Sequence, residues 1–337
     1  MELNLRGTPS EVLPIDEASQ LGHARRVAQR RAEGAGLDET AAGRLALVVM
    51  ELGTNLLKHA GSGLLYLRAV PGLDCQGVEV LAVDRGPGFE LGRCLVDGYS
   101  TRGTQGTGLG ALQRLADVFD AYADARGAAI LARVYPRGAA RDLPLGIVQQ
   151  PIDGETACGD AWHLVLQRGR LGVLVIDGLG HGSEAERAAQ AGAAAYAGAP
   201  FDSPAPLFGE LNRAMTATRG GAVAVAQYDA ATGCLTFAGI GNIGATLLGP
   251  GKPRGLASLP GIVGNQFRKV QSFAYEDVAG QLLILFSDGL QSRWNLDDYP
   301  GLRHRHPALI AAVLHRDFRR GRDDVTVLAI ALEGIRD

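Results

Sequence analysis

Between Tyr135 and Pro144 the chain loses its apolar periodicity. The segment YPRGAARDLP combines two prolines with three charged residues, which is typical of a linker. The 337 residues correspond to two domains at roughly 150 residues each, and 46% of them are hydrophobic, enough for a core on either side of the segment. We therefore predict a first domain over residues 1–137, a linker over 138–144 and a second domain over 145–337.

Charge and cysteine content exclude several classes of protein. The net charge of −3 argues against a nucleic-acid or anionic-membrane binder, which would normally carry a basic surplus. The four cysteines lie far apart with no CxxC pair, which argues against a disulfide scaffold and a zinc ribbon. No run approaches the roughly 18 apolar residues of a membrane span, and the start MELNLRGTPS has no signal-peptide pattern. We expect a cytoplasmic protein without a nucleic-acid partner.

The first block alternates helical and strand patterns. One helix is predicted over residues 16–35 and another over 37–60, whose apolar residues recur on one face: Leu45, Val48, Val49, Leu52 and Leu56. Strands are predicted over 64–70, 78–83 and 128–134, with a further helix over 109–119. This alternation predicts an α/β sandwich.

The second block consists mainly of short apolar runs. Strands are predicted over residues 162–166, 171–176, 222–228, 235–238, 281–286 and 325–331. Helices are predicted over 183–197, 206–216 and 306–314. Many strands with a few long helices indicate stacked sheets flanked by helices.

The long helix of the first block carries an acid and an amide one turn apart. Glu51 and Asn55, in ELGTNLLKHAGSG, are four residues apart, which places both side chains on one helix face. An amide oxygen suits Mg²⁺ as a ligand, and a carboxylate can deprotonate a hydroxyl group.

Two glycine-containing motifs follow in order. Asp84 ends an apolar strand in VLAVDRGPGF, where its carboxylate can accept a hydrogen bond from the adenine amine, and Gly86 and Gly88 allow the backbone to pass close to the base. In GTQGTGLGAL, glycines precede a helix whose free N–H groups can face phosphate. No GxxxxGK[ST] occurs, so the pattern predicts an ATP pocket without a P-loop.

In this order, ExxxN, DxGxG and GxGLG resemble the N, G1 and G2 boxes of the GHKL ATPase superfamily, and the NLLKHAG ending resembles its RsbT-type switch kinases. The resemblance covers about residues 10–135. It implies a Bergerat ATP-binding fold that transfers the γ-phosphate to serine or threonine of a STAS-domain protein of the anti-anti-sigma or RsbS type.

The same resemblance implies a role for each matching residue. Asn55 would hold Mg²⁺, Glu51 would act as the base, and Asp84 would read adenine. Lys58 and His59 either approach phosphate or interact with the helix end, where the dipole favours a cation. The nucleotide would be lined by Gly86, Gly88, Gly106, Thr107, Gly108, Leu109 and Gly110.

In the second block, aspartates stand where predicted strands begin or end. They are Asp160 in ACGDAW, Asp177 in VLVIDGLGHG, Asp288 in LILFSDGL, and Asp323 in GRDDVTVLAI. Carboxylates are rarely buried alone, so four at strand ends are expected to converge. Oxygen ligands favour Mg²⁺ or Mn²⁺, and two such ions can activate a bridging water for attack on a phosphoryl group.

The motifs DGLGHG and RDDVTVL resemble the metal-dependent type 2C (PPM) protein phosphatases of the SpoIIE and RsbX branch, over about residues 145–332. The resemblance implies an α/β-β/α sandwich that holds two Mn²⁺ or Mg²⁺ ions. The metal ligands would be Asp160, Asp177 with the Gly178 carbonyl, Asp288 and Asp323, with Asp324 ranked second.

Some polar residues of this block are left open. His181 is either a general acid or a turn residue. An arginine cluster near Asp323, formed by Arg316, Arg319, Arg320 and Arg322, is expected to be a solvated basic face.

Together the two blocks predict a bifunctional signalling enzyme, with a kinase in the first domain and an opposing phosphatase in the second. Two alternatives stay open. In one, the first domain senses ATP and gates the phosphatase without transferring phosphate. In the other, both domains sequester a sigma factor or antagonist without catalysis.

Overall fold

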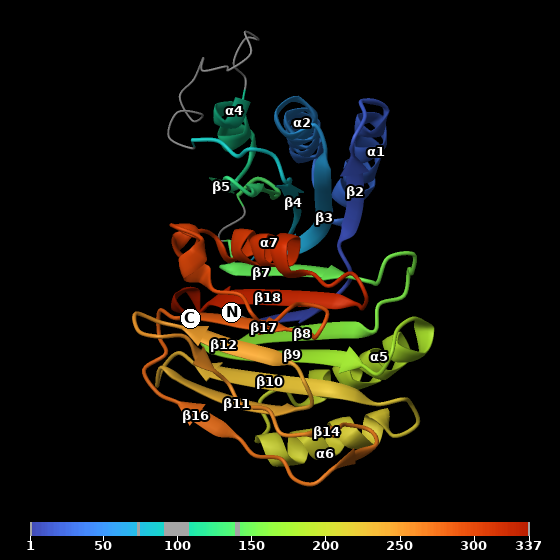
Figure 1. Cartoon of the computed structure of the whole chain (residues 1–337), viewed down its shortest axis with the longest axis vertical. Helices are drawn as coiled ribbons and strands as arrows, with labels where there is room; N and C mark the ends of the chain where they lie inside the picture. Colours follow the sequence, from blue (N-terminus) through green and yellow to red (C-terminus); the bar gives the residue numbers. More distant parts are fainter. Residues whose placement is uncertain (1, 73–74, 91–107, 139–141, 336–337) are drawn as a thin grey trace. The chain divides into compact units, whose positions relative to one another are not determined.

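The computed structural model of the protein describes residues 2–72, 75–90, 108–138 and 142–335 (Figure 1). These form two compact units, and both are discontinuous in sequence. Residues 10–143 and 295–316 form the one-sheet unit, and residues 1–9, 144–294 and 317–337 form the two-sheet unit.

The one-sheet unit is built on five antiparallel strands in the order β2-β3-β4-β6-β5. The strands are β2 (Glu11–Ile15), β3 (Gly63–Pro71), β4 (Gln76–Val83), β5 (Val118–Asp124) and β6 (Gly127–Val134). Three helices lie side by side over one face of this sheet in Figure 1: α1 (Ser19–Gly34), α2 (Glu39–Asn55) and α4 (Gly108–Leu115). The predicted α/β sandwich is confirmed.

The apolar stripe of α2 explains its orientation. Leu45, Val48, Val49 and Leu52 are fully buried against the sheet, as their spacing predicts. Asp38 caps the helix, because its side chain accepts a hydrogen bond from the Ala41 N–H at 2.7 Å. The helix predicted over 109–119 ends earlier, at Leu115, because Val118 starts strand β5 and pairs with Arg133 of β6.

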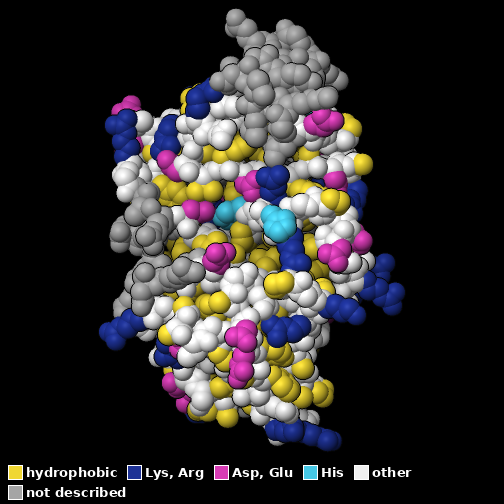
Figure 2. Space-filling view, turned by 90° about the vertical axis from the view of Figure 1, so that its left-hand side faces the viewer, with side chains coloured by type: hydrophobic (Ala, Val, Ile, Leu, Met, Phe, Trp, Pro, Cys, Tyr) yellow, Lys and Arg dark blue, Asp and Glu magenta, His cyan; other side chains and the backbone are white. Residues whose placement is uncertain are grey.

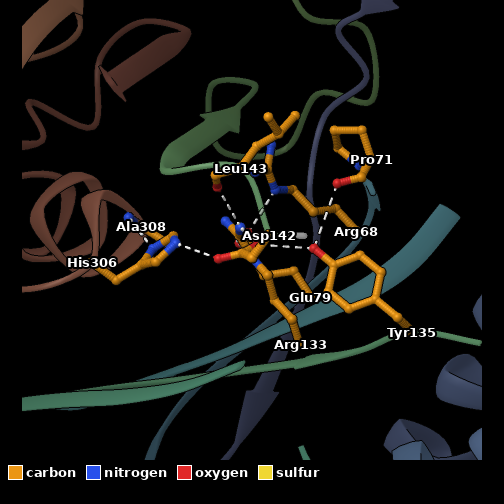
Figure 3. Close-up of polar contacts among 9 residues, drawn as sticks. All are labelled: Arg68, Pro71, Glu79, Arg133, Tyr135, Asp142, Leu143, His306 and Ala308. Atoms are coloured by element: carbon orange, nitrogen blue, oxygen red, sulfur yellow. Dashed lines mark hydrogen bonds and ion pairs between the residues drawn. The ribbon is translucent and has the colours of Figure 1, made fainter. Parts of the chain in front are cut away.

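A buried polar network joins three neighbouring strands of the sheet, β3, β4 and β6 (Figure 3). Glu79, which is fully buried, pairs with Arg68 at 2.7 Å and with Arg133 at 2.6 Å. Arg133 also pairs with Asp142, which accepts a hydrogen bond from Tyr135 Oη at 2.9 Å and contacts His306 Nε2 at 3.0 Å.

Two guanidinium groups decide the charge of Glu79. Burial alone would raise the pKa of Glu79, but Arg68 and Arg133 more than offset this effect and hold the pKa below its usual value. The network is therefore charged and internally neutralised, which keeps buried ions stable.

The segment 295–316 belongs to the one-sheet unit although its sequence neighbours do not. It contains two short 3₁₀ turns, η2 (Leu296–Asp298) and η3 (Leu302–His304), and most of α7 (Pro307–Phe318). His306 N–H donates to Asp120 at 2.7 Å, and the Tyr66 and His315 rings meet edge to face at 5.8 Å. Every residue from Pro307 to Arg316 is buried, as expected for a helix enclosed on all sides.

The two-sheet unit contains a six-stranded and a five-stranded antiparallel sheet. The orders are β1-β8-β9-β10-β11-β16 and β13-β12-β17-β18-β7. The first sheet comprises β1 (Glu2–Arg6), β8 (Asp160–Gln167), β9 (Arg170–Gly178), β10 (Gly221–Asp229), β11 (Cys234–Ile240) and β16 (Phe273–Tyr275). The second comprises β13 (Arg254–Gly255), β12 (Gly244–Leu248), β17 (Leu282–Phe286), β18 (Val325–Ala331) and β7 (Leu145–Gln150). A small pair, β14 (Gly261–Ile262) with β15 (Gln266–Phe267), and a 3₁₀ turn, η4 (Leu332–Gly334), complete it.

Two helices cover the outer side of the first sheet. They are α5 (Ser183–Gly198) and α6 (Pro204–Met215), and they share one apolar core with strands β8 to β11. The alanine-rich side of α5 permits a close approach, since a side-chain carbon added at Gly192 would lie only 2.5 Å from Ile176. The predicted sheet sandwich with flanking helices is confirmed.

The units differ from the predicted domain boundaries at two segments. Strand β1, at the start of the predicted first domain, pairs with β8 from Glu2 against Gln167 to Arg6 against His163. Segment 295–316, within the predicted second domain, packs into the one-sheet unit. Composition marks the linker but does not indicate which sheet a remote strand or helix will join.

Among the described residues, the structure contains no helix that is long and apolar enough to cross a membrane. Acidic and basic side chains are interspersed on the face shown in Figure 2.

Candidate functional site

Glu51 and Asn55 occupy the last two turns of α2 and are partly buried. Because the opposite stripe of the helix is fixed in the core, these two side chains share the remaining face. The structure therefore places this predicted pair as the sequence spacing requires.

A π-helical turn, η1 (Leu56–Ala60), follows Asn55 directly. The sequence predicted a continuous α-helix to Ala60. Instead, its last five residues form a π-helix. Such turns are rare and occur frequently at functional sites. Lys58 and His59 lie on this turn and are exposed, and Gly61 ends it with a φ of 81°.

Asp84 is held firmly beside this turn. Its Oδ1 atom accepts hydrogen bonds from the Gly86 N–H at 2.8 Å and the Ala128 N–H at 3.2 Å. Within the part of the chain that the structure describes, its Oδ2 atom makes no hydrogen bond. A fixed carboxylate with one free oxygen can accept a hydrogen bond from an adenine amine.

The glycines after Asp84 bring the two predicted motifs together. A side-chain carbon at Gly86 would lie 2.9 Å from the Cβ atom of Ala60, the last residue of η1. Gly88 has a φ of 71°, and a side chain there would collide with the Asp124 carbonyl oxygen. Gly86 is therefore required because the backbone passes close to Ala60. Gly88 is required both by its contact with Asp124 and by its positive φ.

The third motif is only partly visible. Gly106 and Thr107 lie outside the described residues, whereas Gly108, Leu109 and Gly110 form the first turn of α4. A side-chain carbon at Gly108 would meet none of the described atoms within 4 Å. Leu109 is buried in the core, and only its backbone is left to face a nucleotide.

In the two-sheet unit, Asp160 and Asp177 are direct partners in the pairing of β8 with β9. Opposed residues of antiparallel strands have Cβ atoms about 4.5–5.5 Å apart. Asp160 is buried and accepts a hydrogen bond from Ser287 Oγ at 2.6 Å. Sequence reasoning did not select Ser287, although it directly precedes Asp288.

The other two aspartates come from the second sheet. Asp288 follows β17 and accepts a hydrogen bond from Asn242 Nδ2 at 2.8 Å, and Asp323 comes shortly before β18, the neighbour of β17. The residues at these strand ends therefore converge from both sheets.

The charges of these carboxylates affect one another's pKa values. Burial, with repulsion from Asp324 and Asp288, raises the pKa of Asp160 to about 7. Burial also raises the pKa of Asp177 to about 9, with added repulsion from Asp160, Asp288, Asp323 and Asp324. Burial and the charge of Asp323 raise the pKa of Asp288. Close like charges penalise the ionised forms, and a divalent cation would offset that penalty.

Across the described residues, no group of three or more His, Cys, Asp or Glu side chains is already arranged around one point as a metal site. The donors are nonetheless all oxygen atoms, which suits Mg²⁺ or Mn²⁺. The residues at this position thus fit a divalent cation by their chemistry and by their mutual repulsion.

Asp324 differs from its neighbour Asp323. Its Oδ1 accepts from the Ile152 N–H at 2.8 Å and its Oδ2 from the Gly159 N–H at 2.6 Å. The Gly159 carbonyl in turn accepts from the Gly178 N–H at 2.9 Å. Asp324 therefore clamps the backbone beside Asp160 and Asp177, which favours Asp323 as the metal ligand of the two.

Gly178, whose carbonyl is a predicted ligand, lies in a crowded turn, where a side chain would collide with the Ala185 carbonyl oxygen. His181 is exposed and its Nδ1 atom lies 3.2 Å from Glu155 Oε1. The structure places His181 on the same loop as Asp177, without deciding between its two predicted roles.

The arginine cluster is not a uniform solvated face. Burial and Asp323 raise the pKa of Asp288, and the nearby charge of Arg320 partly opposes this rise. Arg319 pairs with Asp153 at 2.8 Å, while Arg316 is buried in the one-sheet unit and donates to the Asp84 carbonyl at 3.4 Å. The repeated arginines gave no sequence signal that separates these environments.

Comparisons with known proteins match the two parts of the chain to two different families. Residues 14–134 match the family described as histidine kinase-like ATPase domain, and residues 167–333 match stage II sporulation protein E (SpoIIE). Serine/threonine-protein kinase RsbT of Bacillus subtilis (strain 168) is 31% identical over 97 residues, which cover 28% of this chain and 73% of RsbT.

Solved structures also resemble about half of this chain in fold. A chain from the bacterial stressosome, described as a modular system adapted to control secondary messenger signalling, has a TM-score of 0.53 at 28% identity and covers 56% of this chain and 99% of its own length. RsbX in complex with magnesium has a TM-score of 0.50 at 21% identity, covers 54% of this chain and 92% of its own, and shows likeness of fold alone.

Proposed function

Because the chain belongs to the family of the kinase RsbT through its histidine kinase-like ATPase domain, and continues into a SpoIIE-type phosphatase domain, we propose that it is a bifunctional partner-switching enzyme. The ATPase domain would phosphorylate serine or threonine on a STAS-domain partner, and the SpoIIE-type domain would remove that phosphate. The exchange would take place in the cytoplasm, where ATP is supplied. For the functional domains we keep the proposed boundaries of 1–137 and 145–337.

The observation that carries the kinase proposal is the joining of two motifs at Ala60 and Gly86. This contact brings the end of the Glu51–Asn55 helix to the Asp84 turn. In the proposed reaction Glu51 accepts the proton of the substrate hydroxyl as the hydroxyl oxygen attacks the γ-phosphorus. The bond from the γ-phosphorus to the β–γ bridging oxygen breaks, and ADP leaves. The free Oδ2 of Asp84 orients adenine, and the open N-terminus of α4 faces the phosphates.

Asn55 would hold Mg²⁺ through its amide oxygen, and the ion would neutralise phosphate charge. Lys58 and His59 are exposed on the π-turn directly after Asn55, which supports the proposal that they approach the phosphates.

The phosphatase proposal depends on the converging aspartates. Asp160, Asp177, Asp288 and Asp323, with the Gly178 carbonyl, would hold Mn²⁺ or Mg²⁺, and the ions would supply an activated water and charge neutralisation. Ser287 holds the buried Asp160 carboxylate, and Asp324 holds the backbone at Ile152 and Gly159.

The test uses a STAS-domain protein encoded beside this chain, with ATP and Mg²⁺. Intact-mass spectrometry should show the gain of one phosphoryl group, and Mn²⁺ should reverse it after ATP is removed. Glu51→Gln should abolish the gain while ATP binding persists, and Asp177→Asn should abolish only the reversal. Failure of the wild-type protein to transfer phosphate, with ATP bound, would reject the kinase half.

A second candidate is an ATP-sensing domain that gates the phosphatase. The favouring observation is that Arg316, in segment 295–316, donates to the Asp84 carbonyl, and the same polypeptide reaches Asp323 seven residues later. In this case Glu51→Gln would leave the biological output intact, and ATP alone would change the rate of p-nitrophenyl phosphate hydrolysis.

A further inference from the structure

Two large hydrophobic side chains are strongly exposed in the described part of the chain. Leu47 is 58% exposed and Leu179 is 42% exposed. Single exposed leucines are common on proteins and alone need no explanation. Their positions do need one, because each lies beside a carboxylate proposed as catalytic.

Leu47 lies one helical turn before Glu51 on α2. Residues 47, 51 and 55 follow one another at intervals of four within the helix, so their side chains share one face. Helical side chains lean towards the N-terminus, so Glu51 leans towards Leu47. The neighbouring Val48 and Val49 are fully buried, which shows that Leu47 is not part of the core stripe.

Leu179 directly follows Gly178 on the loop after β9. Its N–H donates to the Gly220 carbonyl at 2.9 Å, which fixes its backbone. Gly180, with a φ of 85°, then turns the chain towards α5. Leu179 thus lies two residues after Asp177 with a fixed backbone and a side chain that is 42% exposed.

Neither position serves the reacting groups themselves. A phosphate ester, a nucleotide or a metal ion gains little from an apolar contact, whereas the surface of a folded protein does. The partner's serine or threonine is phosphorylated at one site and dephosphorylated at the other, so both sites meet the same partner surface around that residue. Both sites would then need the same kind of contact side chain, and both have a leucine.

We propose that Leu47 and Leu179 are the contact residues for one partner: a folded protein with an apolar side chain next to its phosphorylated serine or threonine. This inference rests on the proposed function. It adds the surface chemistry that both sites recognise, each in a separate encounter.

The experiment measures steady-state kinetics of the full-length chain with the STAS-domain protein encoded beside it. Leu47→Ala should raise the KM for that protein in phosphorylation about tenfold, and leave the affinity for ATP unchanged. Leu179→Ala should raise the KM for the phosphorylated protein about tenfold, and leave the rate on p-nitrophenyl phosphate unchanged.

Each variant is the control for the other, because Leu47→Ala should not affect dephosphorylation and Leu179→Ala should not affect phosphorylation. Leu47→Met and Leu179→Met, which keep an apolar side chain of similar volume, should restore most of the affinity. Both alanine variants should fold, since alanine is favourable in a helix and Leu179 is half exposed.

The outcomes separate the two levels of the proposal. Unchanged KM values in both alanine variants, with Glu51→Gln and Asp177→Asn inactive, would overturn the inference and leave the function standing. A fall in p-nitrophenyl phosphate hydrolysis in Leu179→Ala would assign that residue to the metal site and overturn its contact role. Absence of both reactions in the wild-type protein would overturn the inference together with the proposed function.

Discussion

Asp160 and Asp177 stand directly opposite each other on two neighbouring antiparallel strands, and burial raises the pKa of both. Two carboxylates in this position repel each other wherever both are ionised. The protein thus keeps an arrangement that costs stability and that a cation would make favourable.

Asp177→Asn should therefore stabilise the metal-free protein, by about 1–3 kcal/mol near neutral pH, because Asp177, with a pKa raised to about 9, has to take up a proton when the protein folds, whereas asparagine does not. The same variant should lose most of the rise in melting temperature that Mn²⁺ gives to the wild-type protein. Differential scanning calorimetry with EDTA and with Mn²⁺ measures both effects. A destabilised metal-free variant would contradict this account.

Asp323 and Asp324 form a matched pair with different expected roles. Asp324→Asn should lower the free energy of unfolding by about 1–3 kcal/mol, since an amide cannot accept from both the Ile152 and the Gly159 N–H groups. Asp323→Asn should change stability little and abolish metal-dependent phosphatase activity. Thermal melts and p-nitrophenyl phosphate assays on both variants test this, and equal melting temperatures would refute the clamp.

Gly88→Ala should destabilise the one-sheet unit by about 1–3 kcal/mol, because its φ of 71° is unfavourable for alanine and its side chain would collide with Asp124. Gly34→Ala, in α1, is the control, since an added carbon there meets no atom of the described residues within 4 Å. The control should be neutral or slightly stabilising. Urea titrations compare the two, and similar midpoints would contradict the assignment.

His306 should make the stability of the one-sheet unit depend on pH. Burial and the charge of Arg133 lower the pKa of His306, although Asp142 opposes this. The folded state then binds fewer protons than the unfolded state. The contribution of His306 to the free energy of unfolding is therefore complete above about pH 6.5 and declines as the pH falls below it.

His306→Asn should flatten this decline, because asparagine does not titrate and can still accept the Ala308 N–H that His306 Nδ1 accepts at 3.0 Å. Denaturant unfolding at pH 5, 6 and 7 gives the slope. Asp142 has a pKa of about 2: although burial raises it, His306 and Arg133 lower it further, so its own contribution is lost only between about pH 4 and 2. A variant with the wild-type slope between pH 5 and 7 would exclude His306 as the cause.

The sequence predicted most of the regular structure and the motifs of both sites. The α2 stripe was predictable because its period of 3.6 is local. The strands over 162–166 and 171–176 were predicted, but their register, which sets Asp160 opposite Asp177, was not. The π-turn at residues 56–60 was not predictable, since LLKHA has no pattern that distinguishes it from an α-helix.

Long-range choices were beyond sequence reasoning. Nothing in ELNLR indicates that β1 pairs with β8 more than 150 residues later, and nothing near His306 indicates that it contacts Asp142. Asp323 and Asp324 are the same residue type and adjoin in sequence. Only the hydrogen bonds that Asp324 accepts from two backbone N–H groups distinguish their roles. Gly106 and Thr107 lie outside the described residues, so their proposed contact with the nucleotide stays a prediction.

The exchange of segments between the units has a consequence for synthesis on the ribosome. A chain that has emerged only as far as the linker has a strand waiting for a sheet that does not yet exist, and an ATPase sheet whose last helix, residues 307–316, is still untranslated. Neither half can reach its final form early, so the first half is expected to stay incompletely folded until residues 307–316 have been synthesised. A gene cut at the linker would leave both products incomplete, the first without residues 307–316 and the second without strand β1.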